Sequence, residues 1–219
     1  VEWIEVWDRQ ASAVKRIPRK ELVWGYKSSI FQTESGKSYI ILRAALRLSK
    51  TKTDELTYQK ALDVALEQNL DIDNLLDRRT IIIEARRRTG SLWHGKPNDS
   101  KTVGSFFRNP LVDEEMMKKI ITYDESGKTT AEILQMNRVH GGSKNRVSAA
   151  HVLLATGFKR GQRWGSTVKL NDQNVLKIEA LSGATAQNVY DVVKEIQKTC
   201  REKLGIDLVP EARILGDFS

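Results

Sequence analysis

The most regular stretch of the chain is residues 185–205, TAQNVYDVVKEIQKTCREKLG. Its apolar residues recur at intervals of three and four and form one stripe, made of Val189, Val192, Val193, Ile196, Cys200 and Leu204. Thr185 suits the position that caps the start of a helix, and Gly205 suits the left-handed conformation that ends one. The pattern therefore predicts a helix over 186–204 that packs one face on a core.

Outward from this helix, the chain mixes strand and helix patterns. Strands are expected at 1–7, 39–48, 165–170 and 174–179, and helices at 57–68, 74–88, 112–121 and 148–156. Short strand-like pieces are expected around 210–214. Because strands and helices do not alternate regularly, we expect an α+β fold rather than a doubly wound parallel sheet.

Two segments lack periodicity. Residues 24–31 combine large rings, a glycine and small polar residues, which favours a loop or short turn. Residues 89–110 are rich in glycine and proline and predict a long loop, and loops of this length are usually functional or disordered.

The composition narrows the classes of function. No run approaches the roughly 20 apolar residues of a membrane span. The single cysteine, Cys200, cannot form an internal disulfide and indicates a reducing, cytoplasmic location. The three histidines lack metal-ligand spacing, so no metal site is expected. The net charge of +8 favours an anionic partner, either a nucleotide-like molecule or a nucleic acid.

Three segments place polar or ionisable side chains between glycines, prolines and apolar anchors. They are Gly25-Tyr26-Lys27-Ser28-Ser29-Ile30-Phe31, Gly104-Ser105-Phe106-Phe107-Arg108-Asn109-Pro110 and Pro210-Glu211-Ala212-Arg213-Ile214-Leu215-Gly216. Each alone would be a structured loop. In this order they resemble the UDP-N-acetylenolpyruvoylglucosamine reductase family, whose motifs read Gly-Tyr-Arg-x-Ser-x-Phe, Gly-Ser-Phe-Phe-x-Asn-Pro and Pro-Glu-Val-Arg-x-x-Gly.

The resemblance covers almost the whole chain and implies two domains. Residues 1–100 would be the remainder of a second FAD-binding α+β subdomain, and residues 101–219 a substrate-binding domain with a mostly antiparallel sheet flanked by helices. The family's FAD pyrophosphate loops precede everything seen here. We therefore expect a fragment, or one part of a split protein, that does not hold FAD tightly alone and is monomeric when complete.

The resemblance also implies a reaction. Family members use NADPH to reduce bound FAD, and then reduce the enolpyruvyl ether on UDP-N-acetylglucosamine to the lactyl ether of UDP-N-acetylmuramate, a peptidoglycan precursor. By this resemblance, Ser105 supplies the proton and Glu211 polarises the intermediate. Lys27, where the family has an arginine, would contact the substrate carboxylate. The substrate would be held by Tyr58, Asn109, Tyr26 and Arg108.

Three departures from the family pattern leave an alternative open. Lys27 keeps the charge of the usual arginine but loses its planar pair of donors. Thr89-Gly90 stands where a lysine often follows the basic helix end, with Arg88 and Lys96 as possible stand-ins. Residues 174–180 lack a histidine and an asparagine often found there. The alternative is a nucleotide-sugar-binding module with weakened or lost redox activity. A nucleic-acid-binding protein is a further rival, which only the charge supports.

Overall fold

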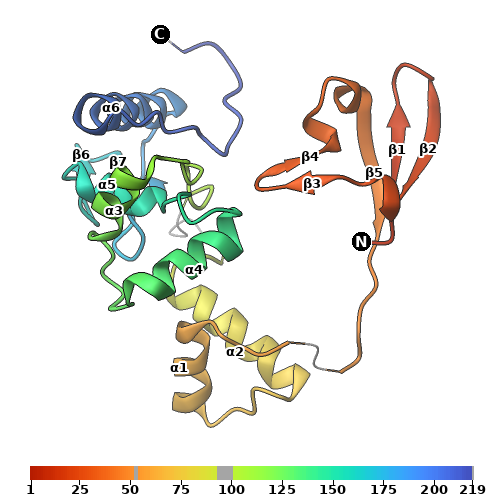
Figure 1. Ribbon diagram of the computed structural model, residues 1–219, viewed down its shortest axis with the longest axis horizontal. Coiled ribbons are helices and arrows are strands. Elements are labelled where there is room, and N and C mark those ends of the chain that lie inside the picture. The colour runs from red at the N-terminus through yellow and green to blue at the C-terminus, as the bar shows by residue number, and fades with distance from the viewer. Residues whose placement is uncertain (52–53, 93–100, 219) are drawn as a thin grey trace. The chain divides into compact units, whose positions relative to one another are not determined.

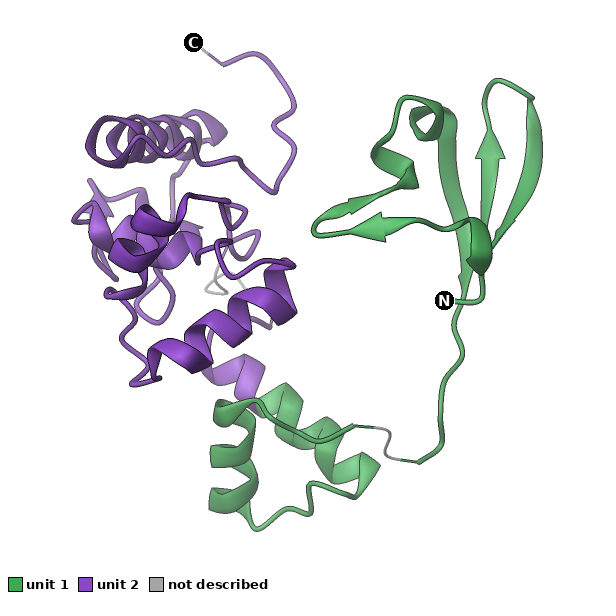
Figure 2. Ribbon diagram, viewed as in Figure 1, with its two compact units in different colours: residues 1–84 green, residues 85–219 purple. Residues whose placement is uncertain are grey.

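The computed structural model describes residues 1–51, 54–92 and 101–218. The chain forms two compact units, Val1–Glu84 and Ala85–Ser219, and each is described by itself (Figure 2). Antiparallel strands and helices occur in both without a parallel βαβ repeat in the described ranges, so the expected α+β class is confirmed. Lys96, one of the possible stand-ins for a family lysine, lies outside the described residues. None of the helices that the structure describes is long and apolar enough to cross a membrane.

The first unit contains an antiparallel three-stranded sheet of order β2-β1-β5 (Figure 1). Its strands are β1 (Trp3–Asp8), β2 (Ala13–Pro18) and β5 (Tyr39–Ala45). Glu5 on the central strand lies opposite Arg16 and Arg43 and pairs with both, at 3.4 and 2.8 Å. Opposite charges at directly facing positions stabilise this pairing of the strands. The predicted strands at 1–7 and 39–48 are confirmed, the second ending earlier.

The segment predicted as a loop or short turn at 24–31 is a tight hairpin followed by a helical turn. Its two strands, β3 (Trp24–Gly25) and β4 (Ser28–Ser29), pair antiparallel, so that Tyr26 and Lys27 form the turn. Three short 3-10 helices surround it: η1 (Arg19–Glu21), η2 (Ile30–Gln32) and η3 (Ser35–Ser38). The Ser29 amide and hydroxyl both donate to the side-chain oxygen of Gln32, which connects the hairpin to η2.

Two helices, α1 (Gln59–Gln68) and α2 (Leu75–Arg88), were both predicted, at 57–68 and 74–88. Asn69, at φ +50°, ends α1 in the left-handed conformation that asparagine tolerates better than most residues. The last turn of α2 carries three arginines, which suits the negative end of the helix dipole.

Four further helices lie in the described part of the second unit. They are α3 (Glu114–Ile121), α4 (Thr130–Gly141), α5 (Ala149–Ala155) and α6 (Ala186–Leu204). The predicted bounds of α6 are confirmed, with Thr185 as the capping residue and Gly205 at φ +66°. α4 was not predicted, because only Ile133 and Gly141 of this helix are buried. Its sequence therefore has no apolar stripe that would indicate a helix. The one sequence feature that indicates the start of this helix is the capping box of Thr129 and Glu132.

The sheet of the second unit is antiparallel with the order β6-β7-β8. Its strands are β6 (Arg163–Trp164), β7 (Val168–Leu170) and β8 (Ile178–Ala180). Two predicted strands were too long. Residues 165–167 form the turn between β6 and β7, and Gly165 adopts φ +57° there. Residues 174–177 form a turn closed by the Lys177 amide, which donates to the Asn174 carbonyl at 3.0 Å.

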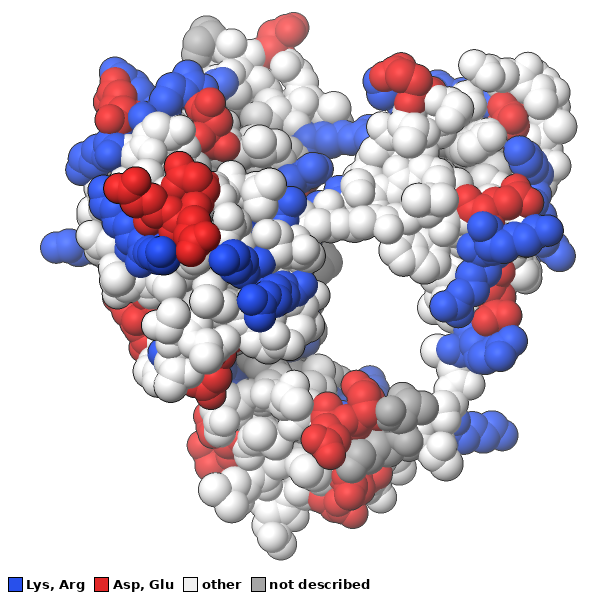
Figure 3. Space-filling view, viewed as in Figure 1, with Lys and Arg blue, Asp and Glu red and all other residues white. Residues whose placement is uncertain are grey.

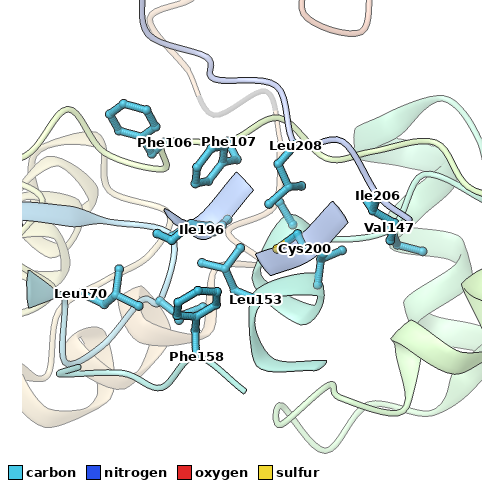
Figure 4. Close-up of a cluster of buried hydrophobic side chains, with 14 of the residues drawn as sticks. Phe106, Phe107, Val147, Leu153, Phe158, Leu170, Ile196, Cys200, Ile206 and Leu208 are labelled. Atoms are coloured by element: carbon cyan, nitrogen blue, oxygen red, sulfur yellow. The ribbon is translucent and has the colours of Figure 1, made fainter. Parts of the chain in front are cut away.

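One apolar core holds the second unit together (Figure 4). The helices α3, α5 and α6 contribute to it, as do β7, β8 and residues 106–107. Cys200 is fully buried within it, at 3.7 Å from the Thr156 hydroxyl, and burial raises the pKa of its thiol. The thiol therefore packs in the core, as the stripe on α6 predicted.

Truncation of Leu153 tests this core. Leu153 is fully buried, so Leu153→Ala is expected to lower the free energy of unfolding by about 2–5 kcal/mol. Val139→Ala is the matched control, because Val139 is 66% exposed on α4 and should change it by less than about 0.5 kcal/mol. Urea denaturation of the purified chain measures both. Equal losses for the two variants would contradict this core assignment.

A second prediction concerns pH. The Nε2 atom of His151 on α5 lies 3.2 Å from a carboxylate oxygen of Asp124, and the His151 side chain is 16% exposed. Glu125 and Arg160 are also near it. Burial lowers the pKa of His151, and the nearby carboxylates only partly oppose this. The unfolded state therefore binds a proton more readily, so stability should fall as pH drops below the ordinary histidine value of 6.5.

Denaturation at pH 7.5 and pH 5 measures this effect. His151→Gln should lose part of the acid sensitivity, whereas His140→Gln should keep it because His140 is exposed. An acid sensitivity unchanged by His151→Gln would contradict the assignment.

Candidate functional site

The glycine–serine motif lies at the centre of an enlarged sheet. Residues 101–108 run antiparallel to β8 on one side, with bridges Lys101 to Ala180 and Ser105 to Lys177. On the other side Phe107 bridges Pro210. The segments 104–110 and 210–216, about a hundred residues apart in sequence, are therefore adjacent parts of one sheet.

Hydrogen bonds fix this arrangement at the motif itself. The Phe106 amide donates to the Leu176 carbonyl at 2.9 Å, and the Phe106 carbonyl accepts from the Glu211 amide at 2.8 Å. The Arg108 amide donates to the Val209 carbonyl at 2.9 Å. Phe106 and Phe107 are both buried, and their rings meet edge to face at 5.4 Å. The two phenylalanines thus anchor the segment that carries Ser105.

Gly104 sets the orientation of Ser105. Between the bridges at Lys101 and Ser105 this segment has three residues, whereas the facing strand has two between Lys177 and Ala180. The extra residue makes a bulge, and Gly104 takes φ +83°, which favours glycine. A bulge redirects the side chain that follows it, and here that side chain is the exposed Ser105.

Ser105 and Glu211 are both exposed, and their main chains are neighbours across Phe106. In a regular sheet, alternation would turn the two side chains to opposite faces. Glu211 and Ala212 lie in a bend, and a bulge precedes Ser105, so strict alternation does not apply here. That the hydroxyl and the carboxyl share one cleft stays a prediction.

Arg108 and Asn109 have different surroundings. The Asn109 side-chain oxygen accepts from the Ala149 amide at 3.0 Å, at the first turn of α5, and the Asn109 carbonyl accepts from Arg146 at 3.1 Å. These contacts attach the motif to α5. The Nε atom of Arg108 is buried, and no acceptor for it exists among the described residues. A buried donor of this kind needs a partner, which a ligand can supply.

The first unit carries the three other predicted residues. Tyr26 and Lys27 form the β3–β4 turn, with Lys27 exposed at φ +49°. The Gln32 amide group donates to the Lys27 carbonyl at 3.3 Å and supports this turn. Tyr58 directly precedes α1, and its side chain is 43% exposed. The position of these three residues around a substrate stays a prediction.

Sequence reasoning missed Lys177. Its side chain is 7% exposed, and its ammonium group donates to the Thr89 carbonyl at 2.9 Å and to the Ser91 hydroxyl at 2.6 Å. Lysine is almost never fully buried unless it is paired, and these two acceptors supply the pairing. No signal in the sequence marked it, because Lys177 lies within the strand predicted at 174–179, where a lysine normally faces solvent.

No metal-binding cluster of histidine, cysteine, aspartate or glutamate occurs in the ranges that the structure describes. Basic and acidic side chains are interleaved on the face shown in Figure 3.

Comparison with known proteins places this site in a class. Residues 96–215 match the model of the UDP-N-acetylenolpyruvoylglucosamine reductase C-terminal domain, more than half of the chain. Fold and site thus define the second unit as a reductase C-terminal domain.

Curated relatives extend the similarity to the first unit. The UDP-N-acetylenolpyruvoylglucosamine reductase of Tropheryma whipplei is 29% identical over 97% of this chain and 61% of its own length. Those of Pseudomonas aeruginosa and Thermobifida fusca are 27% and 23% identical, over 94% and 97% of this chain and 57% and 59% of theirs. The chain belongs to the UDP-N-acetylenolpyruvoylglucosamine reductase family. It spans about three fifths of the length of these relatives.

Proposed function

We propose that this chain is the substrate-binding and proton-donating part of an enzyme that reduces UDP-N-acetylenolpyruvoylglucosamine to UDP-N-acetylmuramate. The observation that carries the proposal is the pairing of residues 106–108 with 209–211, which brings the Ser105 and Glu211 segments together. One free, buried thiol suits a reducing compartment, so we propose a cytoplasmic enzyme.

Ser105 is proposed to give its hydroxyl proton to the carbon next to the substrate carboxylate. A serine hydroxyl is a weak acid, so it can act only on a strongly basic intermediate and only if it is held in place. The bulge at Gly104 and the buried anchors Phe106 and Phe107 supply that rigidity. Glu211 is proposed to polarise the developing enolate from the neighbouring segment.

Arg108 is proposed to bind the substrate through its Nε donor, which is buried without an acceptor among the described residues. Asn109, Tyr26 and Tyr58 are proposed to complete the substrate site. Lys27 is proposed to contact the substrate carboxylate in place of the family's arginine, with one charged donor instead of a planar pair.

FAD reduced by NADPH would supply the hydride. The first unit fits an incomplete FAD-binding subdomain. β5 is an edge strand on which the consecutive residues Ile40, Ile41 and Leu42 are 50, 52 and 48% exposed, so both of its faces present apolar side chains. Large exposed apolar patches mark contact surfaces for proteins, membranes or ligands, and we propose that this strand contacts another part of the complete protein. We assign no residue of this chain to the flavin.

Two measurements test the proposal. The complete protein should bind FAD, and it should oxidise NADPH beyond one equivalent per bound FAD only when UDP-N-acetylenolpyruvoylglucosamine is present. The 219-residue chain alone should elute from gel filtration without flavin. A complete protein that binds the nucleotide-sugar but never oxidises NADPH would support the alternative, a binding module. A yellow 219-residue chain would refute the assignment of the first unit as incomplete.

A further inference from the structure

The buried ammonium group of Lys177 lies at the turn after α2, although Lys177 itself belongs to the turn that leads into β8. It contacts the Thr89 carbonyl and the Ser91 hydroxyl, which are 88 and 86 residues away in sequence. The family resemblance predicts a lysine at this turn, whereas this chain has Thr89-Gly90-Ser91. The structure therefore brings a lysine to this turn from a different element.

The same lysine lies directly beside the candidate site. Lys177 is the bridge partner of Ser105, and facing residues of antiparallel strands have Cβ atoms about 4.5–5.5 Å apart. A cavity of about 350 Å³ adjoins Lys177 and Gly104, the residue before Ser105. Its described lining includes Lys177 and Arg86 but no acidic side chain, together with Ser91, Thr102 and the backbone of Gly104.

We propose that Lys177 takes the place of a lysine in the α2 turn and supplies the positive charge with which this cavity binds an anionic oxygen group of the nucleotide-sugar. This inference rests on the proposed function. The group is a phosphate or a carboxylate, since both have the oxygen acceptors and the charge that lysine and arginine bind. Lys177 thereby becomes a substrate-binding residue that the family motifs do not include.

A purely structural role makes a different prediction. If Lys177 only clamps the turn, loss of its contacts to Thr89 and Ser91 should lower the melting temperature and leave the binding of anionic compounds unchanged. Lys177→Gln has a side chain one bond shorter, keeps an N–H donor and removes the charge. Lys177→Arg keeps the charge, and the double variant Ser91→Lys with Lys177→Gln returns an ammonium group to the turn from its other side.

Calorimetric titration of the complete protein separates these roles. UDP-N-acetylglucosamine carries the diphosphate alone, whereas the enolpyruvyl substrate carries the carboxylate as well. Loss of a charge-assisted contact should raise Kd by about tenfold or more. We expect this rise for Lys177→Gln at unchanged melting temperature, little change for Lys177→Arg, and recovery in the double variant. Lys198→Gln, on the exposed face of α6, is the control and should bind like the wild type.

The pattern across the two compounds identifies the anionic group. Weaker binding of both indicates a phosphate, and weaker binding of the enolpyruvyl compound alone indicates the carboxylate. The inference is overturned if Lys177→Gln binds both compounds within twofold of the wild type, or if the double variant folds and does not recover. If Lys177→Gln does not fold, the double variant decides by the same criterion. A wild-type protein that binds neither compound would refute the proposed function and this inference together.

Discussion

Ser105→Ala is expected to lower kcat of the complete enzyme by about 10²–10⁴-fold, the usual contribution of a positioned proton donor. The Kd for UDP-N-acetylglucosamine should stay within about twofold, because the methyl group fits the exposed position after Gly104 without disturbing Phe106 or Phe107. The reduction of bound FAD by NADPH should also be unchanged, because Ser105 is proposed to act only in the second half-reaction.

Rapid-mixing spectroscopy of the flavin separates the two half-reactions. Reduction by NADPH and reoxidation by the enolpyruvyl substrate are followed in wild type, Ser105→Ala and the control Ser166→Ala, whose serine is exposed in the β6–β7 turn. The expected result is a slow reoxidation in Ser105→Ala alone. A wild-type reoxidation rate in that variant would exclude Ser105 as the proton donor.

Lys27→Arg is expected to raise kcat/KM of the complete enzyme by roughly ten- to a hundredfold. The gain follows from a second charge-assisted hydrogen bond to the substrate carboxylate and the developing enolate, worth about 1.5–3 kcal/mol. Lys27 has φ +49° in the β3–β4 turn, and an arginine meets the same backbone conformation, so the change should not alter stability. The effect should therefore be confined to catalysis.

Steady-state oxidation of NADPH measures this gain, and Lys20→Arg, at an exposed position in η1, serves as the matched control. A Lys27→Arg enzyme that is no faster than the wild type would show that the side chain at this turn does not meet the reacting group.

The elements that were predicted best are those whose buried apolar residues recur at regular intervals in the sequence. The α6 stripe ends in Cys200 and Leu204, and its bounds were correct because the helix buries one face. β2 was missed because it is an edge strand and Ile17 is its only buried residue. Without a buried face there is no alternation to detect. α4 was missed for the same reason, and only its capping box could have indicated it.

The sequence indicated which residues to expect in the site, but it did not predict how the strands bring them together. The motifs at Ser105 and Glu211 were recognised, yet nothing in the sequence shows that Phe106 pairs with both Leu176 and Glu211. Such pairings join residues about 70 and 105 positions apart, and short patterns carry no information about them. Lys177 was missed because its importance comes only from the turn that it reaches.

A crystal structure of the complete protein with bound FAD and UDP-N-acetylenolpyruvoylglucosamine tests the central claim most directly. We predict the Ser105 hydroxyl within about 4 Å of the carbon next to the substrate carboxylate, and the Glu211 carboxyl group at a similar distance on the other side of the enolpyruvyl group. A complex in which either side chain points away from the enolpyruvyl group, at about 10 Å or more, would contradict the account.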